Sequence, residues 1–348
     1  MSTKIKARNV SGGELELIRQ IRQRAGTVGR SPNVRLGIGD DCALIRPGKG
    51  EELAITTDLS IAGRHFRIDW HPPEIVGRRT LARGLSDLAA MGARPVAAFL
   101  SLGVPKDLTV EPDKTRQGSK KSWVDSFLFG LFDYAQAYGV PLAGGDLAES
   151  PVALADIVLV GAVPRGKALL RSGARAGDQL YVTGALGGSA VGLARLAELS
   201  NPEISDPLPD QDWYRGLSAQ LHPKPRIPQG LVLRRRNLAT AAIDLSDGLS
   251  TDLAHLCEES GVSATIESEL LPIAKSASLD QALHGGEDYE LLFTARPKTR
   301  MPRSIAGVPI TRIGHISECI PDEPAVTIAT RGVLGPLEAR GWQHFSES

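Results

Sequence analysis

The chain has 348 residues, of which 40 are basic and 40 acidic, so its formal net charge at pH 7 is zero. This balance argues against a nucleic-acid scaffold, whose affinity comes mainly from clustered Lys and Arg side chains facing phosphates. The length fits two domains of roughly 150 residues each better than a single hydrophobic core. No stretch approaches the roughly 20 apolar residues that span a bilayer, so we expect a soluble protein without a membrane partner.

Neither the N-terminal segment nor the cysteines suggest export or a thiolate metal site. Residues 1–8 are basic but precede a Gly-rich run instead of an apolar stretch, so we expect no secretory signal and cytoplasmic residence. Cys42, Cys257 and Cys319 are odd in number, far apart and without CxxC spacing, which predicts three small buried residues. The seven histidines are scattered, so any bound metal ion must have oxygen ligands.

The first half of the chain alternates helical and extended patterns. Apolar residues at helical spacing, each time followed by a glycine, predict helices over residues 14–24, 80–91 and 123–138. Continuous apolar runs predict strands over residues 52–58, 97–104 and 156–163. The charged segment 106–121 predicts a surface loop to which we assign no role. Residues 164–167, Pro-Arg-Gly-Lys, predict the domain boundary.

The second half repeats this alternation. It predicts strands over residues 178–184, 240–247, 262–266, 289–295 and 310–316. It also predicts helices over residues 189–199, 229–236 and 248–260, and a loop over 201–211. Alternating elements, 37 glycines and only 5% aromatic residues together indicate an α/β protein rather than a β-sandwich.

Acidic residues stand beside glycines or at predicted strand ends in five segments. These segments are Gly39-Asp40-Asp41, Thr56-Thr57-Asp58, Gly144-Gly145-Asp146, Asp244-Leu245-Ser246-Asp247-Gly248 and Gly285-Gly286-Glu287-Asp288. Each segment alone is also typical of an ordinary turn. Ser246 and Asp247 could simply cap the helix that follows, and Asp87 could form an exposed ion pair with Arg83, four residues earlier.

If several of these carboxylates converge, a cation must balance them. Two carboxylates about 4 Å apart repel by roughly 4 kcal/mol at an effective dielectric constant of 20. Oxygen ligands favour Mg²⁺, with Mn²⁺ as a possible substitute, and Mg²⁺ commonly bridges carboxylates to substrate phosphates. There is no Walker loop and no GxSxG motif, and the Gly-rich segment 184–189 predicts a tight structural turn. Spacing alone leaves paired-carboxylate glycosidase chemistry open.

The order of these motifs resembles that of the thiamine-monophosphate kinases, which belong to a larger superfamily of ATP-using synthetases. The resemblance covers about residues 13–345 and includes, in order, LGIGDDCA (36–43), TTD (56–58), AGRHF (62–66), LSDLAAMGA (85–93), GGD (144–146), RSGA (171–174), IDLSDG (243–248) and GGEDYEL (285–291). Single motifs are shared with the superfamily, whereas the ordered set with GGEDYEL is specific to the kinases. Leu147 departs from the family pattern, which often has Thr there.

The resemblance implies transfer of the γ-phosphoryl group of ATP to thiamine monophosphate, assisted by several Mg²⁺ ions, in a homodimer. It implies an N-terminal domain, residues 1–164, that binds ATP and Mg²⁺ and whose mixed sheet pairs across the dimer. It also implies a C-terminal α/β domain, residues 165–348, which has a mixed sheet and completes the substrate site.

The resemblance also assigns roles to individual residues. The implied Mg²⁺ ligands are Asp41, Thr56, Thr57, Asp58, Asp87, Asp146, Asp244 and Asp247. The implied ATP contacts are Gly145, Asp146, Arg171 and Ser246. The implied substrate contacts are His65, Glu287 and Trp342. Two of these have simpler interpretations, because His65 could be a half-exposed loop residue and Trp342 could only pin the C-terminus.

The implied chemistry needs no catalytic His or Ser. The acceptor is a phosphate monoester with a second pKa near 6, so it already carries an anionic oxygen nucleophile at pH 7. Positioning and cations therefore have to overcome the repulsion between two phosphate groups. Two alternatives remain: another ATP-dependent synthetase of the superfamily, such as an aminoimidazole ribonucleotide or selenophosphate synthetase, and a non-catalytic protein that binds Mg²⁺ and a nucleotide.

Overall fold

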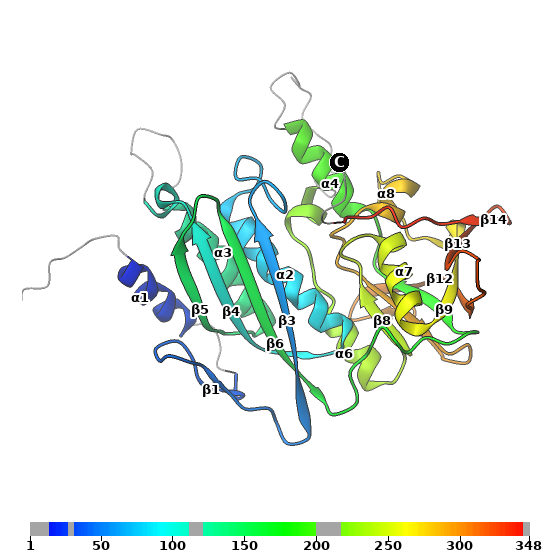
Figure 1. The fold of residues 1–348 in the computed structure, drawn as a ribbon, viewed down its shortest axis with the longest axis horizontal. Coiled ribbons are helices and arrows are strands. Elements are labelled where there is room, and N and C mark those ends of the chain that lie inside the picture. The colour runs from blue at the N-terminus through cyan, green and yellow to red at the C-terminus, as the bar shows by residue number, and fades with distance from the viewer. Residues whose placement is uncertain (1–13, 27–30, 111–120, 200–216, 344–348) are drawn as a thin grey trace, which may run out of the picture.

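The computed structural model describes residues 14–26, 31–110, 121–199 and 217–343. The described chain forms two sheets, which lie beside each other in Figure 1 with helix α2 (Pro73–Ala90) between them. The first, the N-terminal sheet, has the order β3-β6-β4-β5. Its strands are β3 (Glu51–Ile61), β4 (Arg94–Val104), β5 (Leu142–Glu149) and β6 (Leu154–Pro164). Only the β4–β5 pair is parallel, so the sheet is mixed.

The second sheet, the C-terminal sheet, has the order β14-β13-β9-β12-β7-β10-β8, with β11 paired to β12. Its strands are β7 (Gln179–Thr183), β8 (Ala241–Asp244), β9 (Val262–Glu267), β10 (Leu291–Ala295), β11 (Ser304–Ile305), β12 (Val308–Glu318), β13 (Val326–Thr330) and β14 (Val333–Pro336). The β13–β9 pair is parallel and its neighbours are antiparallel. The predicted α/β class with two mixed sheets is therefore confirmed.

Helices cover one face of the N-terminal sheet. In Figure 1, α2 and α3 (Trp123–Tyr138) lie behind the sheet, α1 (Glu14–Ala25) lies beside β5, and the short pair β1 (Val34–Leu36) and β2 (Leu44–Ile45) lies below it. The other helices are α4 (Gly188–Leu199), α6 (Ile227–Arg235), α7 (Leu249–Ser260) and α8 (Leu279–His284). No helix in the described part of the chain is long and apolar enough to cross a membrane.

Two glycines allow α2 and α3 to pack backbone against backbone. A Cβ on Gly77 of α2 would lie 2.0 Å from the carbonyl oxygen of Phe127, and one on Gly130 of α3 would lie 1.9 Å from that of Glu74. Leu81 and Leu85 of α2 are fully buried in the same core. Helix α2 is thus fixed against α3 on one side and the N-terminal sheet on another, which makes it a rigid support for the site.

Several local predictions need correction. Helix α2 begins at Pro73 instead of residue 80, because its first two turns carry arginines that interrupt the apolar spacing. Strand β5 is not among the predicted strands, because its Gly-Gly-Asp run is typical of a turn. Pairing with β4 stabilises it as an edge strand. The predicted strand 240–247 ends at Asp244.

The cysteine prediction is also wrong in part. Cys257 is buried in α7, but Cys42 and Cys319 are exposed, because both lie in connections outside the packed elements. Of the predicted loop 106–121, residues 106–109 form one 3₁₀ turn and residues 111–120 lie outside the described residues, as does the predicted loop 201–211.

Candidate functional site

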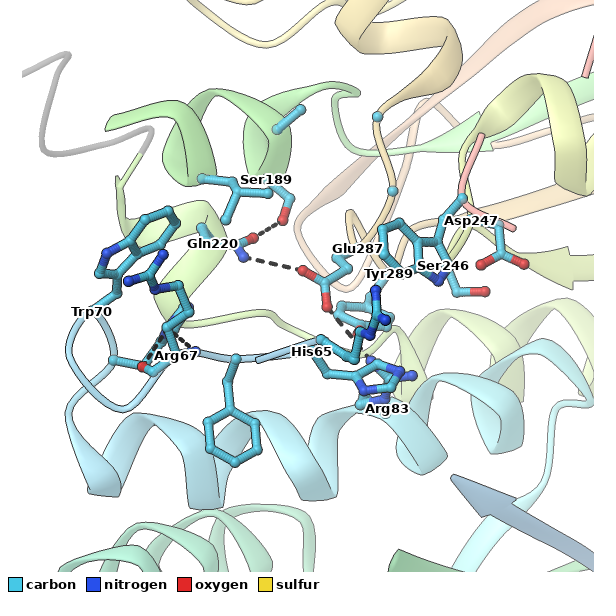
Figure 2. Close-up of a pocket in the computed structure, with 18 of the residues that line it drawn as sticks. His65, Arg67, Trp70, Arg83, Ser189, Gln220, Ser246, Asp247, Glu287 and Tyr289 are labelled. Atoms are coloured by element: carbon cyan, nitrogen blue, oxygen red, sulfur yellow. Dashed lines mark hydrogen bonds and ion pairs between the residues drawn. The ribbon is translucent and has the colours of Figure 1, made fainter. Parts of the chain in front are cut away.

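A cavity of about 640 Å³ opens between the two sheets, beside α2. Residues from both halves of the chain surround it. The loop 63–71 between β3 and α2 forms one wall and α4 forms another, with Arg83 and Asp87 of α2 between them. The remaining lining comes from Asp58 of β3, Gln220, Asp244 and the segment after it, the segment 285–289 and Trp342 near the C-terminus. Figure 2 shows Trp70 and Arg67 at one end and Ser246 and Asp247 at the other.

One end of the cavity is rich in carboxylates that α2 and two strands bring together. Arg83 and Asp87 are one helical turn apart, and Asp87 Oδ2 accepts a hydrogen bond from Thr56 Oγ1 of β3 at 2.5 Å. Arg83 Nε donates to Asp58 Oδ1 at 2.7 Å. On the other side, Ser86 Oγ donates to Asp244 Oδ2 of β8 at 2.6 Å. The helix therefore connects acidic residues of the N-terminal sheet to those of the C-terminal sheet.

These contacts decide between two interpretations of Asp87. The exposed ion pair with Arg83 is wrong, because Arg83 pairs with Asp58 and Glu287, and its side chain is only 18% exposed. The carboxylate of Asp87 instead lies between Thr56 and the buried Asp244.

At the acidic end, burial and mutual repulsion destabilise the ionised form of the carboxylates. Burial raises the pKa of Asp244 to about 7, and the charge of Asp87 adds to the shift. Burial also raises the pKa of Asp87, and it raises that of Asp58 to about 6 although Arg83 opposes the shift. Carboxylates that resist ionisation in this way would be stabilised by a cation between them.

The donor set fits Mg²⁺ only together with a phosphate ligand. Among the residues that the structure describes, no group of three or more His, Cys, Asp or Glu side chains is arranged to hold a metal ion. Mg²⁺, however, often keeps several waters and takes only one or two carboxylates plus substrate phosphates. The mutual repulsion of Asp87 and Asp244 fits that mode of binding, with Asp58 and Asp247 also lining the same cavity.

The loop after β8 is held by a residue that the sequence did not single out. Asp252 Oδ2 accepts hydrogen bonds from the backbone N–H groups of Ser246, Asp247 and Gly248 at 3.0 to 3.1 Å. Helix α7 begins after Gly248, whose φ is 118°, and no side chain caps it. The interpretation of Ser246 and Asp247 as N-caps is therefore wrong, and both residues line the cavity.

Glu287 lies at the middle of the cavity in a dense hydrogen-bond network. Arg79 Nη2 donates to both of its carboxylate oxygens at 2.8 Å, and Gln220 Nε2 donates to Oε2 at 3.1 Å. Gln220 is held in turn by Ser189 Oγ of α4 and by Arg79 Nη1, which donates to its backbone carbonyl. Burial alone would raise the pKa of Glu287, but Arg79, Arg83 and Gln220 lower it to about 2. Glu287 is thus a permanent anion whose oxygens already have partners.

The backbone around Glu287 is unusual. Glu287 has a φ of 65° and Tyr289 a φ of 51°, in the left-handed region that few non-glycine residues adopt. Such conformations cost about 1–3 kcal/mol each and persist where surrounding contacts impose them. Here the backbone N–H of Glu287 donates to Ser246 O and that of Tyr289 to Leu245 O, which fixes the segment against the loop after β8.

The opposite end of the cavity is apolar and aromatic. Ala190, Leu193, Ala194 and Ala197 of α4 line it, facing the loop that carries Trp70. The Arg67 guanidinium lies 4.3 Å from the centre of the Trp70 ring, so this ring already has a cation on one face. A cavity with carboxylates at one end and an aromatic wall at the other suits a ligand that joins a phosphate to a heterocycle.

His65 and Trp342 both line this cavity. The half-buried His65 accepts a hydrogen bond at Nδ1 from the backbone N–H of Ile61 at 3.1 Å. The backbone N–H of Trp342 donates to Asp247 O at 2.9 Å, and the residue is 47% exposed. Trp342 therefore pins the C-terminal segment and faces the ligand space at the same time.

Other predicted residues lie outside the cavity of this chain. Thr57 is exposed on the face of β3 opposite Thr56 and Asp58, as strand alternation requires. Asp146 of β5 is opposite Ser101 of β4 on that same face, which no described helix covers, and a Cβ on Gly145 would lie 1.9 Å from Leu100 O. Asp41 is exposed in the turn before β2.

Arg171 is exposed as well, but it is still close enough to the acidic end for its charge to oppose the pKa shifts of Asp87 and Asp244. The predicted residues are therefore divided: some line the cavity, Thr57, Gly145 and Asp146 lie on strands of the N-terminal sheet, and Asp41 and Arg171 lie in exposed connections.

Arg79, Gln220 and Arg83 were missed as site residues. Arg79 and Glu287 are 208 positions apart, so no local pattern connects them. The one available signal was the four-residue spacing of Arg79, Arg83 and Asp87, which places all three on one side of a helix.

Two family models match this chain: AIR synthase related protein, N-terminal domain, over residues 39–163, and AIR synthase related protein, C-terminal domain, over residues 175–318. The chain therefore belongs to the AIR synthase related class.

Individual relatives of known name indicate which family within this class the chain belongs to. The Escherichia coli (strain K12) protein named thiamine-monophosphate kinase is 40% identical over 326 residues, covering 90% of this chain and 93% of that protein. A crystal structure of thiamine-monophosphate kinase from Stenotrophomonas maltophilia K279a has 35% identity and a TM-score of 0.74, covering 91% of this chain and 96% of the other. AaThiL complexed with AMPPCP and TMP has 30% identity and a TM-score of 0.71, covering 99% and 100%. The chain belongs to the thiamine-monophosphate kinase family.

Proposed function

We propose that this protein transfers the γ-phosphoryl group of ATP to thiamine monophosphate and releases thiamine diphosphate and ADP. The observation that carries the proposal is the cavity itself, which has paired carboxylates at one end and an aromatic, apolar wall at the other. Support comes from AaThiL, a family member complexed with AMPPCP, an ATP analogue, and TMP.

In the proposed reaction, an oxygen of the acceptor phosphate forms a bond to the γ-phosphorus of ATP. The bond from that phosphorus to the bridging oxygen breaks, and ADP leaves with the electron pair. The acceptor oxygen is already ionised near pH 7, so no side chain has to remove a proton. When bound, several Mg²⁺ ions would neutralise the charge of the phosphates. Thr56, Asp58, Asp87, Asp244 and Asp247 would hold them within this chain.

The cavity walls position the acceptor. His65, Glu287 and Trp342 line the space that we assign to thiamine monophosphate. The α4 wall and Trp70 exclude water from one side of the heterocycle, and Asp252 keeps Ser246 and Asp247 in place at the phosphate end. Holding both phosphates in line is the main task of the protein in such a transfer.

We also propose a homodimer that uses the face of the N-terminal sheet that no described helix covers. Ile55 and Leu59 of β3 are 63% and 44% exposed on this face, which also carries Thr57 and Asp146. Asp41, Gly145 and Arg171 likewise lie outside the cavity of a single chain. Pairing of two subunits on this face would place Thr57 and Asp146 at the interface, where a second chain could complete the Mg²⁺ and ATP contacts that the resemblance implies for them.

Two further predictions stay proposals. We propose a division into residues 1–164 and 165–348, supported by the passage of the chain from one sheet to the other after β6 ends at Pro164. Cytoplasmic residence rests only on the sequence.

The function is tested by incubating the purified protein with Mg-ATP and thiamine monophosphate and separating the products by chromatography. We expect thiamine diphosphate and ADP in equal amounts, and no phosphorylation of free thiamine. ATP binding without ADP formation would indicate a non-catalytic nucleotide-binding protein. Turnover only with other acceptors would indicate a different synthetase of the class.

A further inference from the structure

Arg83 is the cavity-lining cation whose surroundings are most fixed. Its Nε donates to Asp58 Oδ1 at 2.7 Å, and its Nη1 lies 3.5 Å from Glu287 Oε1. Glu287 is itself anchored by Arg79 and Gln220, so the guanidinium is held from two sides by residues of both halves of the chain. In Figure 2, Arg83 lies beneath His65, between Glu287 and the Ser246 end of the cavity.

This guanidinium still has donors to spare. Its Nη2 has no hydrogen-bond partner among the residues that the structure describes, and it is not one of their unpaired polar atoms shielded from solvent. A guanidinium offers five N–H donors in a planar fork that matches a phosphate. Because Asp58 binds Nε and Glu287 lies at Nη1, Nη2 is the nitrogen left to bind a ligand in the cavity that Arg83 lines.

Other cations on the cavity wall are less suited to this position. Arg67 is paired with Asp69 at 2.6 and 3.0 Å and stacked on Trp70, at the aromatic end. Arg64 is exposed on the loop between β3 and α2. Arg83, by contrast, is one helical turn from Asp87 and lines the cavity beside Asp58, at the acidic end.

We propose that Arg83 is a catalytic residue that binds the phosphate of the acceptor, and that Glu287, Arg79 and Gln220 are positioning residues acting through it. This inference rests on the proposed function. In it, Glu287 orients Arg83 instead of contacting the substrate directly. Arg83 donates to the acceptor phosphate through Nη2 and reduces its repulsion from the γ-phosphate. The phosphate lies between Arg83 and the carboxylate end, and the heterocycle extends toward Trp70. The buried ion pairs keep the guanidinium ready before substrate arrives, so little reorganisation is needed.

The test compares binding of thiamine monophosphate and free thiamine by titration calorimetry with Mg²⁺ and AMPPCP present, so that no turnover occurs. We expect the wild type to bind the monophosphate more tightly than thiamine. Arg83→Met should weaken binding of the monophosphate by roughly 10- to 100-fold, the effect of losing a charge-assisted contact, and leave thiamine affinity within about threefold. Arg83→Lys, which keeps the charge and loses the fork, should give an intermediate loss.

Arg78→Met provides the matched control, because Arg78 is on the same helix but pairs with Asp133 away from the cavity. It should bind both ligands as the wild type does. Equal losses for monophosphate and thiamine in Arg83→Met, or no loss for either, would overturn the assignment. If Arg83→Met does not fold, the Arg83→Lys variant alone tests the assignment. Unchanged affinity for the monophosphate and unchanged kcat in Arg83→Lys would then overturn the assignment of Arg83. A wild type that forms no thiamine diphosphate refutes the proposed function instead, which separates the two failures.

Discussion

Carboxylates of this site differ in their ionisation because their neighbours differ. Glu287 has arginines on one side and a pKa of about 2, whereas Asp244 faces another carboxylate from a buried position and has a pKa of about 7. Both residues belong to Gly- and Asp-rich motifs that look alike in the sequence. Residue type predicted an acidic site, but only the partners show which acids are permanently charged and which need a cation.

We expect Asp87→Asn to lower kcat at least about 100-fold, because the side chain loses the charge proposed to hold Mg²⁺. The substitution keeps an oxygen for Thr56 and removes the repulsion from Asp244, so the melting temperature without Mg²⁺ should not fall. Steady-state assays and thermal unfolding check this pair of outcomes.

Adding Mg²⁺ and AMPPCP should raise the melting temperature of the wild type more than that of Asp87→Asn. Wild-type turnover in a folded variant, or an equal rise in both proteins, would remove Asp87 from the proposed Mg²⁺ ligands.

At the scale of elements, α2 joins the two halves of the site. At four-residue intervals it carries the buried Arg79, which binds Glu287, and then Arg83 and Asp87, which line the cavity, while Leu81 and Leu85 pack into the core. Its close contact with α3 fixes where that row of side chains lies. Sequence periodicity identified the second half of α2, whereas the first half was hidden because Arg79 is buried by an ion pair rather than by apolar contact.

Gly130→Ala tests the backbone contact of α3 with α2. The added Cβ would overlap Glu74 O, so the two helices must separate, and we expect a loss of at least about 2 kcal/mol in the free energy of unfolding. Gly139→Ala, at the left-handed end of α3 with nothing within 4 Å of its Cβ, should cost only about 1 kcal/mol. Denaturant unfolding measures both, and an equal cost for the two would contradict this account of the packing.

Asp288 holds the N-terminal end of α4 and gives a stability that depends on pH. Its carboxylate accepts the backbone N–H groups of Gly187 at 2.6 Å and Ser189 at 3.0 Å, and burial raises its pKa from 3.8 to about 7. The folded protein therefore keeps a proton that the unfolded chain releases above pH 4. It follows that the free energy of unfolding falls as the pH rises from 4 through 7.

Asp288→Asn should remove that contribution while keeping an acceptor for one of the two N–H groups. Between pH 5 and pH 7, we expect the wild type to lose about 2 kcal/mol relative to the variant. Urea unfolding at both pH values measures this difference, and parallel pH profiles for the two proteins would show that Asp288 is ionised throughout.

At the scale of the molecule, the N-terminal sheet leaves one face without a helix in the described chain, as Figure 1 shows. Strand β3 exposes Ile55 and Leu59 on this face, and such an apolar surface would favour pairing with another copy of itself. The residues on this face that the family resemblance links to ATP and Mg²⁺ would then lie at the boundary between two subunits.

We expect Ile55→Glu with Leu59→Glu to convert a dimer into monomers, measured by light scattering after size-exclusion chromatography, because burying two carboxylates in an apolar interface is costly. Activity should fall in the same variant. Val333→Glu, at a 73% exposed position near the far end of the C-terminal sheet, should leave the dimer intact. A monomeric wild type with full activity would contradict the dimer proposal.

The sequence by itself determined the α/β class, most helices and strands, and the acidic character of the site, because apolar spacing and Gly-Asp motifs are local properties of the chain. Tertiary structure alone decided which of those residues meet. It placed Thr56 and Thr57 on opposite faces of β3, and it placed Asp146 on the face of the N-terminal sheet that no described helix covers. It joined Arg79 to Glu287 across 208 positions, because burial of one charge requires a partner that only folding can bring near.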